Sequence, residues 1–391
     1  MKRNTIKCID ALNGLKELSG NSVDVMITSP PYWSLRDYHV KGQLGLEPNA
    51  DDYLDSLWEI FREVKRVLKE DGTCWVNLGD KYGTPNSPFI HSRRETTWAK
   101  CLLGIPERFI LGMQEEGWFL RNKIIWHKPN AMPSAVKDRF SCTWEYVFFF
   151  SNSEKYHFDL DAIRVPHKPE SLRRAKNKWD GKTIKECSWK GLSPEAMCHP
   201  KGRNPGDMVN DMGILNNSTA NLYRSSDLQP HPMGKNPGDC WHISTRGFSG
   251  AHFATFPEQL IERAIKASPT AICAQCGKAK TRITKVTRSD SVPNRSGTAE
   301  NAHKASVNAR IAQPKTRYTT KHTTVGWKSC DCGAPFKPAV ILDPFMGSGT
   351  TAMVAKRLGR NYLGFELNPD YVKMAEERIE KVIEDNREDT P

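Results

Sequence analysis

The chain has 391 residues, 38% hydrophobic and 26% charged, which allows two or three domains with a large buried core. Its 57 basic and 45 acidic residues leave a net charge of +12, which favours an anionic partner, nucleic acid above all. The longest apolar run, Tyr146 to Phe150, is too short to cross a bilayer, and no apolar stretch follows the basic N-terminus. We therefore expect no membrane span and no secretory signal, and a cytoplasmic protein.

In the first 165 residues, strand-forming runs alternate with amphipathic segments. A β-branched run over 23–28 ends at two prolines, which cannot continue a strand ladder. Apolar residues three or four apart predict a helix from Asp51 to Glu70. We also expect a helix over 106–117 and strands at 74–78, 122–126, 144–150 and, more weakly, 156–159. This alternation predicts a mostly parallel sheet with helices on both faces.

Two stretches without periodicity interrupt the pattern, one over 165–246 and one over 289–324. Between them, Phe256-Pro257 opens a helix, with a proline suited to the first turn. After them we expect a strand at 339–342, a helix at 350–358, a strand at 362–365 and a helix at 370–384. Long irregular stretches in an enzyme predict functional loops or partly disordered insertions.

The segment from Val340 to Ala352 runs from strand to helix through Gly347-Ser348-Gly349, a turn that lets a ligand approach the backbone closely. No lysine follows Gly349, which argues against a P-loop for ATP. The spacing fits a dinucleotide, and S-adenosylmethionine also binds over such a turn. Glu366, at the end of the next strand, can take both ribose hydroxyls of either ligand.

The first strand leads into Thr28-Ser29-Pro30-Pro31-Tyr32-Trp33. Two prolines stiffen this turn and leave the Pro30 carbonyl as a fixed acceptor beside the Ser29 hydroxyl and two aromatic faces. The arrangement suits an amino group held over an aromatic ring. The alternative is a rigid turn on the protein surface. It is disfavoured because the preceding strand has a sequence typical of a buried strand.

These motifs resemble those of the DNA amino-methyltransferases, in which a (Asp/Asn/Ser)-Pro-Pro-(Tyr/Phe) turn grips the exocyclic amine and a Phe-x-Gly-x-Gly turn binds S-adenosylmethionine. Further similar motifs lie at 9–12, at 126–130 with 138–139, and at 253–257. The catalytic turn precedes the cofactor turn, as in the permuted beta class. The resemblance implies an α/β fold with a doubly wound, mostly parallel, seven-stranded methyltransferase sheet, circularly permuted and carrying irregular insertions.

The resemblance also implies the site residues and partners. Ser29, Pro30, Pro31 and Tyr32 would be catalytic, with Tyr32 and Trp33 against a flipped-out base. The residues expected to bind the cofactor are Asp10, Thr28, Phe256, Pro257, Asp343, Pro344, Phe345, Gly347, Gly349, Thr350 and Glu366. Double-stranded DNA is the implied substrate, and a cognate restriction endonuclease is a further implied partner.

The same resemblance divides the chain into functional parts. Residues 1–164 would form the catalytic half, and residues 334–391 the cofactor-binding half. Residues 165–246 would recognise the target, with Arg173, Arg174 and Arg203 reading guanine edges, touching phosphate or facing solvent. Residues 247–272 would close over the cofactor. Residues 273–333 are set apart on other grounds, given below, as a zinc-anchored basic insertion.

The target base remains open at this point. In the family that the chain resembles, Ser-Pro-Pro-Tyr is commonest in enzymes that methylate cytosine N4, and Asp-Pro-Pro-Tyr is typical of adenine N6 enzymes, so Ser29 favours cytosine. Methylation of glutamine or RNA is a more distant alternative. A zinc-anchored nucleic-acid-binding module with a vestigial cofactor fold is another, although a pure binder has no use for the turn from Ser29 to Tyr32.

Eleven cysteines, an odd number scattered along the chain, argue against a disulfide framework. The close pairs Cys273/Cys276 and Cys330/Cys332 resemble halves of a zinc knuckle and predict a tetrahedral structural site, with unrelated thiols as the alternative. Residues 277–329, between the pairs, hold 12 basic and 2 acidic residues and so carry most of the net charge. We interpret this segment as a basic arm that clamps DNA, with a solvated disordered loop as the alternative.

Overall fold

The computed structural model describes residues 2–84, 99–166, 235–245, 256–290 and 318–388. The chain divides into two compact units. The first comprises Met1–Ile163, Pro237–Lys280 and Ser329–Pro391, and the second comprises Arg164–Asn236 and Thr281–Lys328. The predicted target-recognition region, with its three arginines, lies almost wholly outside the described residues.

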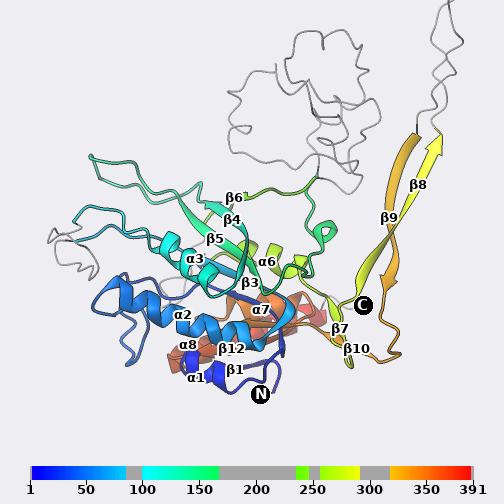
Figure 1. Cartoon of the computed structure of the whole chain (residues 1–391), viewed down its shortest axis with the longest axis horizontal. Helices are drawn as coiled ribbons and strands as arrows, with labels where there is room; N and C mark the ends of the chain where they lie inside the picture. Colours follow the sequence, from blue (N-terminus) through cyan, green and yellow to red (C-terminus); the bar gives the residue numbers. More distant parts are fainter. Residues whose placement is uncertain (1, 85–98, 167–234, 246–255, 291–317, 389–391) are drawn as a thin grey trace, which may run out of the picture. The chain divides into compact units, whose positions relative to one another are not determined.

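The first unit is built on an eight-stranded sheet with the strand order β1-β12-β11-β2-β3-β5-β4-β6 (Figure 1). Neighbours from β1 to β3 are parallel, β5 is antiparallel to both of its neighbours, and β6 is parallel to β4. The strands are β1 (Thr5–Cys8), β2 (Val23–Thr28), β3 (Leu68–Leu78), β4 (Phe119–His127), β5 (Trp144–Ser151), β6 (Cys240–His242), β11 (Val340–Asp343) and β12 (Asn361–Glu366).

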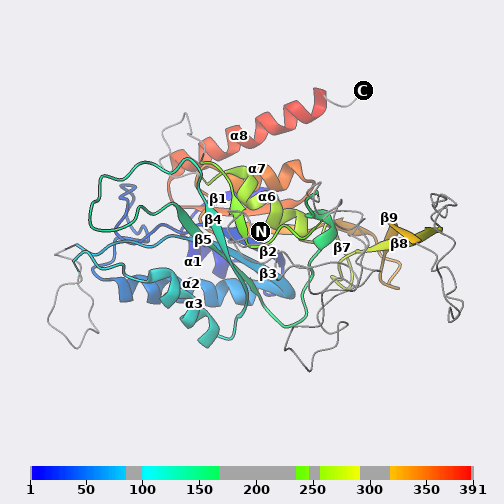
Figure 2. The same cartoon turned by 90° about the horizontal axis from the view of Figure 1, so that it is seen from above.

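Helices cover both faces of this sheet, as Figure 2 shows. One face carries α1 (Ala11–Lys16), α2 (Ala50–Val67) and α3 (Ile105–Glu115), and the other carries α6 (Glu258–Ala267), α7 (Thr350–Arg357) and α8 (Pro369–Glu388). Alternate strand residues feed the two cores: Phe148 and Phe150 pack with the first set of helices, whereas Val147 and Phe149 pack with the second. The expected doubly wound α/β sheet is confirmed, with the last two strands of the chain inserted between β1 and β2.

The sheet has one strand more than the seven expected. β6 pairs with the outer side of β4, so that Trp126 and Trp241 are register partners and both are buried. A strand of three residues is too short to show an alternating pattern, which is why the sequence placed it in an irregular stretch. Its pairing covers backbone groups of β4 that would otherwise form an open edge.

The weak strand expected at 156–159 is wrong, because these residues form a loop that leads into a 3-10 helix, η1 (Leu160–Ala162). Two aromatic residues spaced two apart imitate strand alternation here. Tyr156 and Phe158 instead both pack on Phe149, each with a ring-centroid separation of 5.6 Å.

The second unit, in its described part, contains an antiparallel hairpin of β8 (Thr281–Asp290) and β9 (Tyr318–Lys328). The stretch expected to be irregular therefore includes part of a strand from residue 318 onward, which agrees with its many β-branched threonines. In the first unit, β7 (Ala271–Cys273) and β10 (Phe336–Pro338) form a small antiparallel pair. No helix among the described residues is long and apolar enough to span a membrane.

Candidate active site

The site lies where the direction of chain winding changes within the parallel part of the sheet. β2 and β11 are neighbours, but β2 is followed by a helix on one face and β11 by a helix on the other. The carboxyl ends of two such strands open into a crevice, the usual ligand position in doubly wound sheets. Here Thr28, the last residue of β2, donates from Oγ1 to Oδ1 of Asp343, the last residue of β11, over 2.6 Å. Two turns separated by more than 300 residues therefore meet.

Asp343 organises this junction. Its carboxylate is 1% exposed and accepts from the Phe345 backbone N–H over 3.0 Å and from Thr351 Oγ1 over 2.6 Å, in addition to Thr28. Burial raises the pKa of Asp343 to about 6. The carboxylate thus holds the glycine turn against Thr28 at the end of β2. Asp343 itself does not line the cavity described below.

The glycine turn has the backbone geometry that its sequence predicts. Gly347 and Gly349 have φ values of 53° and 80°, in the left-handed region that favours glycine. The Gly347 N–H donates to Glu366 Oε2 over 2.7 Å, so the turn and the end of β12 are joined directly. Burial raises the pKa of Glu366. From α8, Arg378 Nη1 donates to the Ser348 carbonyl over 2.6 Å.

A cavity of about 280 Å³ lies over this junction. Its size is close to the lower end of the roughly 300–1,000 Å³ common for small-molecule sites. The predicted residues that line it are Asp10, Ser29, Pro31, Phe256, Pro344, Phe345, Gly347, Thr350 and Glu366. Sequence reasoning missed further wall residues, among them Tyr38, Gln43, Glu47, Asn368 and Tyr371.

Other predicted residues lie outside the cavity wall. Besides Asp343, these are Thr28, Pro30, Tyr32, Trp33, Pro257 and Gly349. Asp10, which does line the cavity, also caps α1 by accepting from the Asn13 N–H over 2.9 Å. Pro257 occupies the N-cap position of α6. Residues 253–255 of the expected closing motif lie outside the described residues.

The Tyr32 hydroxyl, at the end of the turn from Ser29 to Tyr32, lies in a polar network. It is 3.0 Å from Glu145 Oε2, to which it donates, and 3.3 Å from Asn77 Oδ1. Glu145 also forms an ion pair with the Lys128 ammonium. Burial and the nearby Glu145 carboxylate raise the pKa of Tyr32 well above its ordinary value, so the hydroxyl stays protonated. A side chain at Gly79 would come within 2.6 Å of the Tyr32 ring, which therefore needs glycine there.

Two buried side chains hold the turn from beneath. Tyr53, on α2, donates from its hydroxyl to the Pro31 carbonyl over 2.7 Å. The Trp33 indole is 3% exposed and donates from Nε1 to the Glu47 carbonyl over 3.0 Å. The structure thus places the Trp33 indole in the core under the turn, and its expected contact with a flipped-out base stays a prediction.

Asn77, Lys128 and Glu145 were not predicted as site residues. Asn77 follows from the fold, since it lies near the end of β3, beside β2, where parallel strands share an edge. Lys128 stands in a motif that the resemblance covered without assigning it a role. Glu145 lies at the start of an antiparallel strand and carries no signal in the sequence.

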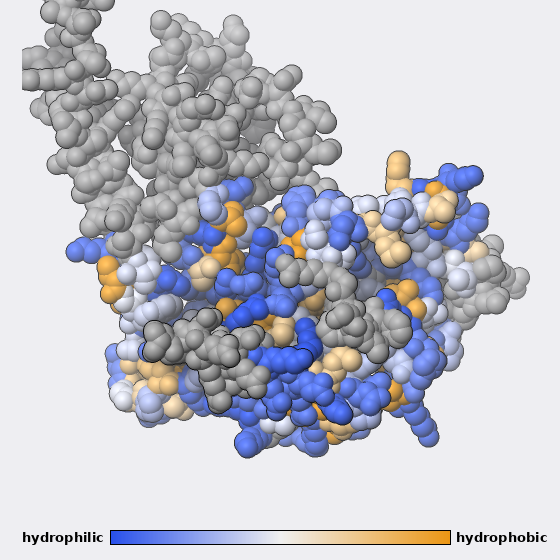
Figure 3. All heavy atoms as spheres, turned by 180° about the vertical axis from the view of Figure 1, so that it is seen from behind, coloured by the Kyte–Doolittle hydropathy of each residue, from blue (hydrophilic) through white to orange (hydrophobic). Residues whose placement is uncertain are grey.

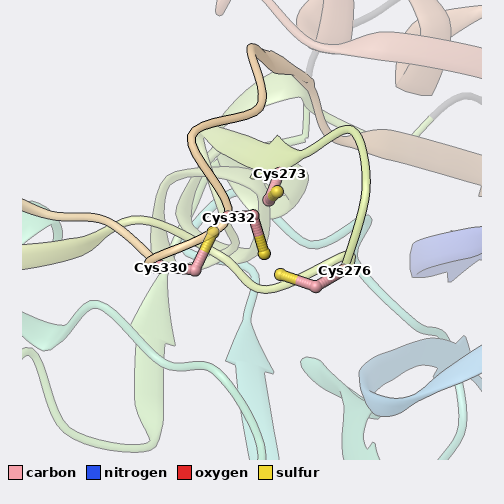
Figure 4. Close-up of side chains that lie close together, drawn as sticks. All are labelled: Cys273, Cys276, Cys330 and Cys332. Atoms are coloured by element: carbon pink, nitrogen blue, oxygen red, sulfur yellow. The ribbon is translucent and has the colours of Figure 1, made fainter.

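The four paired cysteines converge, as Figure 4 shows, with their sulfur atoms all within 4.8 Å of one another. Sulfur atoms around zinc at a Zn–S distance of about 2.3 Å in a tetrahedron are about 3.8 Å apart, so a small adjustment produces a closed site. Hydrogen bonds from the backbone of Cys276 and Gln275 lower the pKa of Cys273 to about 6. The four converging sulfur donors fit a tetrahedral metal site, in which a bound ion would favour the thiolate form of each cysteine.

Comparison with known proteins gives matches along most of the chain. A family model described as DNA methylase matches residues 23–270 and 279–377. Type II methyltransferase M.Cfr9I of Citrobacter freundii is 31% identical over 95% of this chain and 86% of its own length. Type II methyltransferase M.SfiI of Streptomyces fimbriatus is 30% identical over 93% and 88%. Among solved structures, PvuII DNA methyltransferase (cytosine-N4-specific) covers 98% of this chain and 91% of its own, at 16% identity and a TM-score of 0.49, a likeness too distant to bear on function.

Proposed function

The chain belongs to the DNA methylase family of N6 and N4 amino-methyltransferases, and on that premise we propose that it methylates the N4 amine of cytosine in a base flipped out of duplex DNA, with S-adenosylmethionine as the methyl donor. The observation that carries this proposal is the bond between Thr28 and Asp343, which joins the amine-holding turn to the glycine turn. Ser29 from one turn and Gly347 from the other line the same cavity.

The lining of the cavity is suited to a cofactor that contains a nucleoside. The residues that would hold it are the turn from Pro344 to Gly347, Glu366 for the ribose, and Asp10 with Phe256 at the cavity wall. Tyr38 and Tyr371, whose rings meet edge-on with centroids 6.3 Å apart, add an aromatic wall. S-adenosylmethionine supplies, when bound, an electrophilic methyl group.

The residues of the turn would activate the amine. The exocyclic amine of cytosine is a poor nucleophile because its lone pair is delocalised into the ring. The Pro30 carbonyl and Ser29 Oγ would accept hydrogen bonds from the amine, which favours localisation of the lone pair and stabilises the positive charge that develops on nitrogen. The transfer would form an N–C bond and break the C–S bond of the donor, leaving S-adenosylhomocysteine, and the surplus amine proton would pass to water. No covalent enzyme intermediate is required, so no cysteine acts as a nucleophile.

Ser29 supports cytosine as the target base. In the family that the sequence resembles, Ser-Pro-Pro-Tyr is commonest in cytosine N4 enzymes, although the Pro30 carbonyl can hold the amine of either base. Expression in a bacterial host without DNA methylation of its own, followed by mass spectrometry of the digested DNA, separates the two products. N4-methylcytosine is the expected product. N6-methyladenine would contradict the base assignment and leave the methyltransferase intact, whereas unmodified DNA would contradict both.

A cognate restriction endonuclease is proposed as a functional partner, because the named relatives are type II methyltransferases. Sequencing the modified bases of the expressing host identifies the target sequence. DNA methylated there should then resist an endonuclease that cuts the same sequence. Cleavage at the usual rate would contradict a protective role.

We also propose that the four converging cysteines bind one structural zinc ion. Removal of the ion should destabilise the pair of β7 and β10, since β7 carries Cys273. Metal analysis of the purified protein should give about one zinc per chain. Cys276→Ser should reduce this content strongly, whereas the exposed Cys8, replaced in the same way, should not. A wild-type chain without zinc would contradict the proposal.

A further inference from the structure

Two exposed apolar side chains have no part in the function proposed above. Phe140 is 96% exposed and Met132 is 89% exposed, the highest values among the large hydrophobic side chains of the described residues. Both lie on residues 128–143, which connect β4 to β5 and are called here the β4–β5 loop. Figure 1 shows this loop extending beyond its strands, and the corresponding protrusion at the upper right of Figure 3 carries apolar side chains, as do several other places on this face.

The base of the β4–β5 loop adjoins the catalytic turn. The Lys128 N–H donates to the Thr143 carbonyl over 2.8 Å and closes the loop. The Lys128 ammonium then pairs with Glu145, which accepts from the Tyr32 hydroxyl. The loop therefore leaves the sheet beside Tyr32, whose ring we expect to stack on the flipped base.

The part of the loop that carries Phe140 is held in place. The Arg139 guanidinium lies 4.0 Å from the centroid of the Tyr82 ring, and Asp138 forms an ion pair of 3.2 Å with Lys100. Tyr82 follows Lys81, whose ammonium donates to the Ser34 carbonyl just after the catalytic turn. The backbone next to Phe140 is thus tied to the site on one side, while the ring itself is open to solvent.

We propose that Phe140 is a wedge that enters the duplex base stack in the space left by the flipped base, with Met132 against the same stack. The inference rests on the proposed function, because only an enzyme that flips a base creates that space. Apolar side chains of this kind stabilise an opened duplex by replacing the lost stacking. Lys137 and Arg139 precede the ring and favour the approach of a polyanion.

The test compares Phe140→Ala with the wild type on two duplexes that contain the target sequence found in the modified host DNA. One duplex is fully paired, and the other has an abasic site opposite the target base, so that little pairing is left to break. On the paired duplex we expect the single-turnover methylation rate to fall by about tenfold or more, in line with the loss of one stacking contact. On the abasic duplex the rate should return to within about twofold of the wild type, because the opening cost is already met.

Leu111→Ala is the matched control, since Leu111 is 60% exposed, apolar and located on α3. It should leave both rates unchanged, and both variants should keep the wild-type melting temperature and affinity for S-adenosylmethionine. An unchanged rate for Phe140→Ala on the paired duplex, or an equal loss on both duplexes, would overturn the wedge. Failure of the proposed function looks different, because the wild type would then methylate neither duplex.

Discussion

Tyr32 combines two properties that substitution can separate, a ring in the turn that we propose to hold the amine and a hydroxyl bonded to Glu145. Tyr32→Phe keeps the ring, so we expect the turnover number to fall by about tenfold or less, the share of one positioning hydrogen bond of roughly 1 kcal/mol. Tyr32→Ala removes the stacking surface as well and should cost about a hundredfold. Turnover is measured with a tritiated methyl donor.

Cofactor affinity is the internal control for both variants, because Tyr32 does not line the cavity. Calorimetry should give an unchanged dissociation constant for S-adenosylmethionine. A loss of affinity as large as the loss of turnover would show that Tyr32 supports the cofactor site and not the base.

Asp343 makes stability depend on pH in a direction opposite to that of a salt-bridged aspartate. Burial raises its folded-state pKa from 3.8 to about 6, so the folded chain binds more protons than the unfolded chain between these values. Its contribution to the free energy of unfolding is therefore largest below pH 4 and declines by about 3 kcal/mol as the pH rises to 6. The amide of Asp343→Asn does not titrate, so the free energy of unfolding of this variant should lack this decline.

Urea unfolding of both proteins at pH 4.5 and pH 7 measures the difference. The stability of Asp343→Asn relative to the wild type should rise between the two values, which also cancels the contribution of other buried carboxyl groups. A constant difference would mean that Asp343 has an ordinary pKa in the folded protein.

At the scale of single residues, the sequence indicates positions with an unusual backbone, and it does not indicate those that depend on neighbours in space. The turn from Ser29 to Tyr32 and the glycine turn can be recognised in the sequence, because prolines and glycines at positive φ leave few other backbone conformations. The burial of Trp33 could not be predicted, because only the folded chain brings the Glu47 carbonyl beneath its indole. Glu145 becomes visible only once β5 brings it to Tyr32.

Among the secondary-structure elements, the contact between α7 and α8 depends on Gly349. A Cβ atom at this position would lie 2.6 Å from the Ala375 Cβ on α8, and φ is +80°. Gly349→Ala should therefore combine backbone strain of roughly 1 kcal/mol with overpacking of about 1–3 kcal/mol. Gly359→Ala is a matched control, since its φ of +70° imposes similar strain but nothing lies within 4 Å of the added atom.

The free energy of unfolding in urea checks this prediction. Gly349→Ala should lose at least about 1 kcal/mol more than Gly359→Ala, the lower end of the cost of overpacking. Equal losses would show that α8 can shift to accommodate a methyl group and that the glycine serves only the turn.

The sequence predicts elements well where periodicity extends over several turns or pleats. The helix expected from Asp51 to Glu70 is observed as Ala50–Val67, with Asn49 as its N-cap, and it ends early because β3 begins at Leu68, six residues before the strand expected at 74–78. The last strand-helix-strand-helix run is recovered with small shifts at the ends. The failures are short or mixed segments. β6 has three residues, and the loop after β5 imitates a strand because its aromatic rings pack on a common neighbour.

For the molecule as a whole, charge is concentrated in one segment. Residues 277–329 carry 12 basic and 2 acidic residues, which leaves a net charge of only +2 on the rest of the chain. Within the described residues, this segment includes the hairpin of β8 and β9, where Arg282 packs on Trp327 with its guanidinium 4.7 Å from the ring centroid. We expect the segment to bind DNA phosphates without reading sequence.

The exposed residues Lys278, Lys285 and Lys328 test this role, because replacing all three with glutamine lowers the positive charge and leaves Arg282 in place. DNA binding should weaken to a similar extent for target and non-target duplexes. Each lost phosphate contact should flatten the slope of log affinity against log salt by about 0.9. Fluorescence anisotropy over a series of salt concentrations measures both quantities.

The control replaces the exposed Lys155, Lys373 and Lys381, which changes the net charge equally outside the segment. If long-range attraction by total charge were responsible, both triple variants would lose the same affinity, whereas direct phosphate contacts predict a change of slope only in the first. A changed target preference at an unchanged slope would instead assign sequence reading to the hairpin. The distinction follows from the short range of screened charges, about 8 Å at physiological salt, which makes the location of a lysine matter more than its contribution to the total.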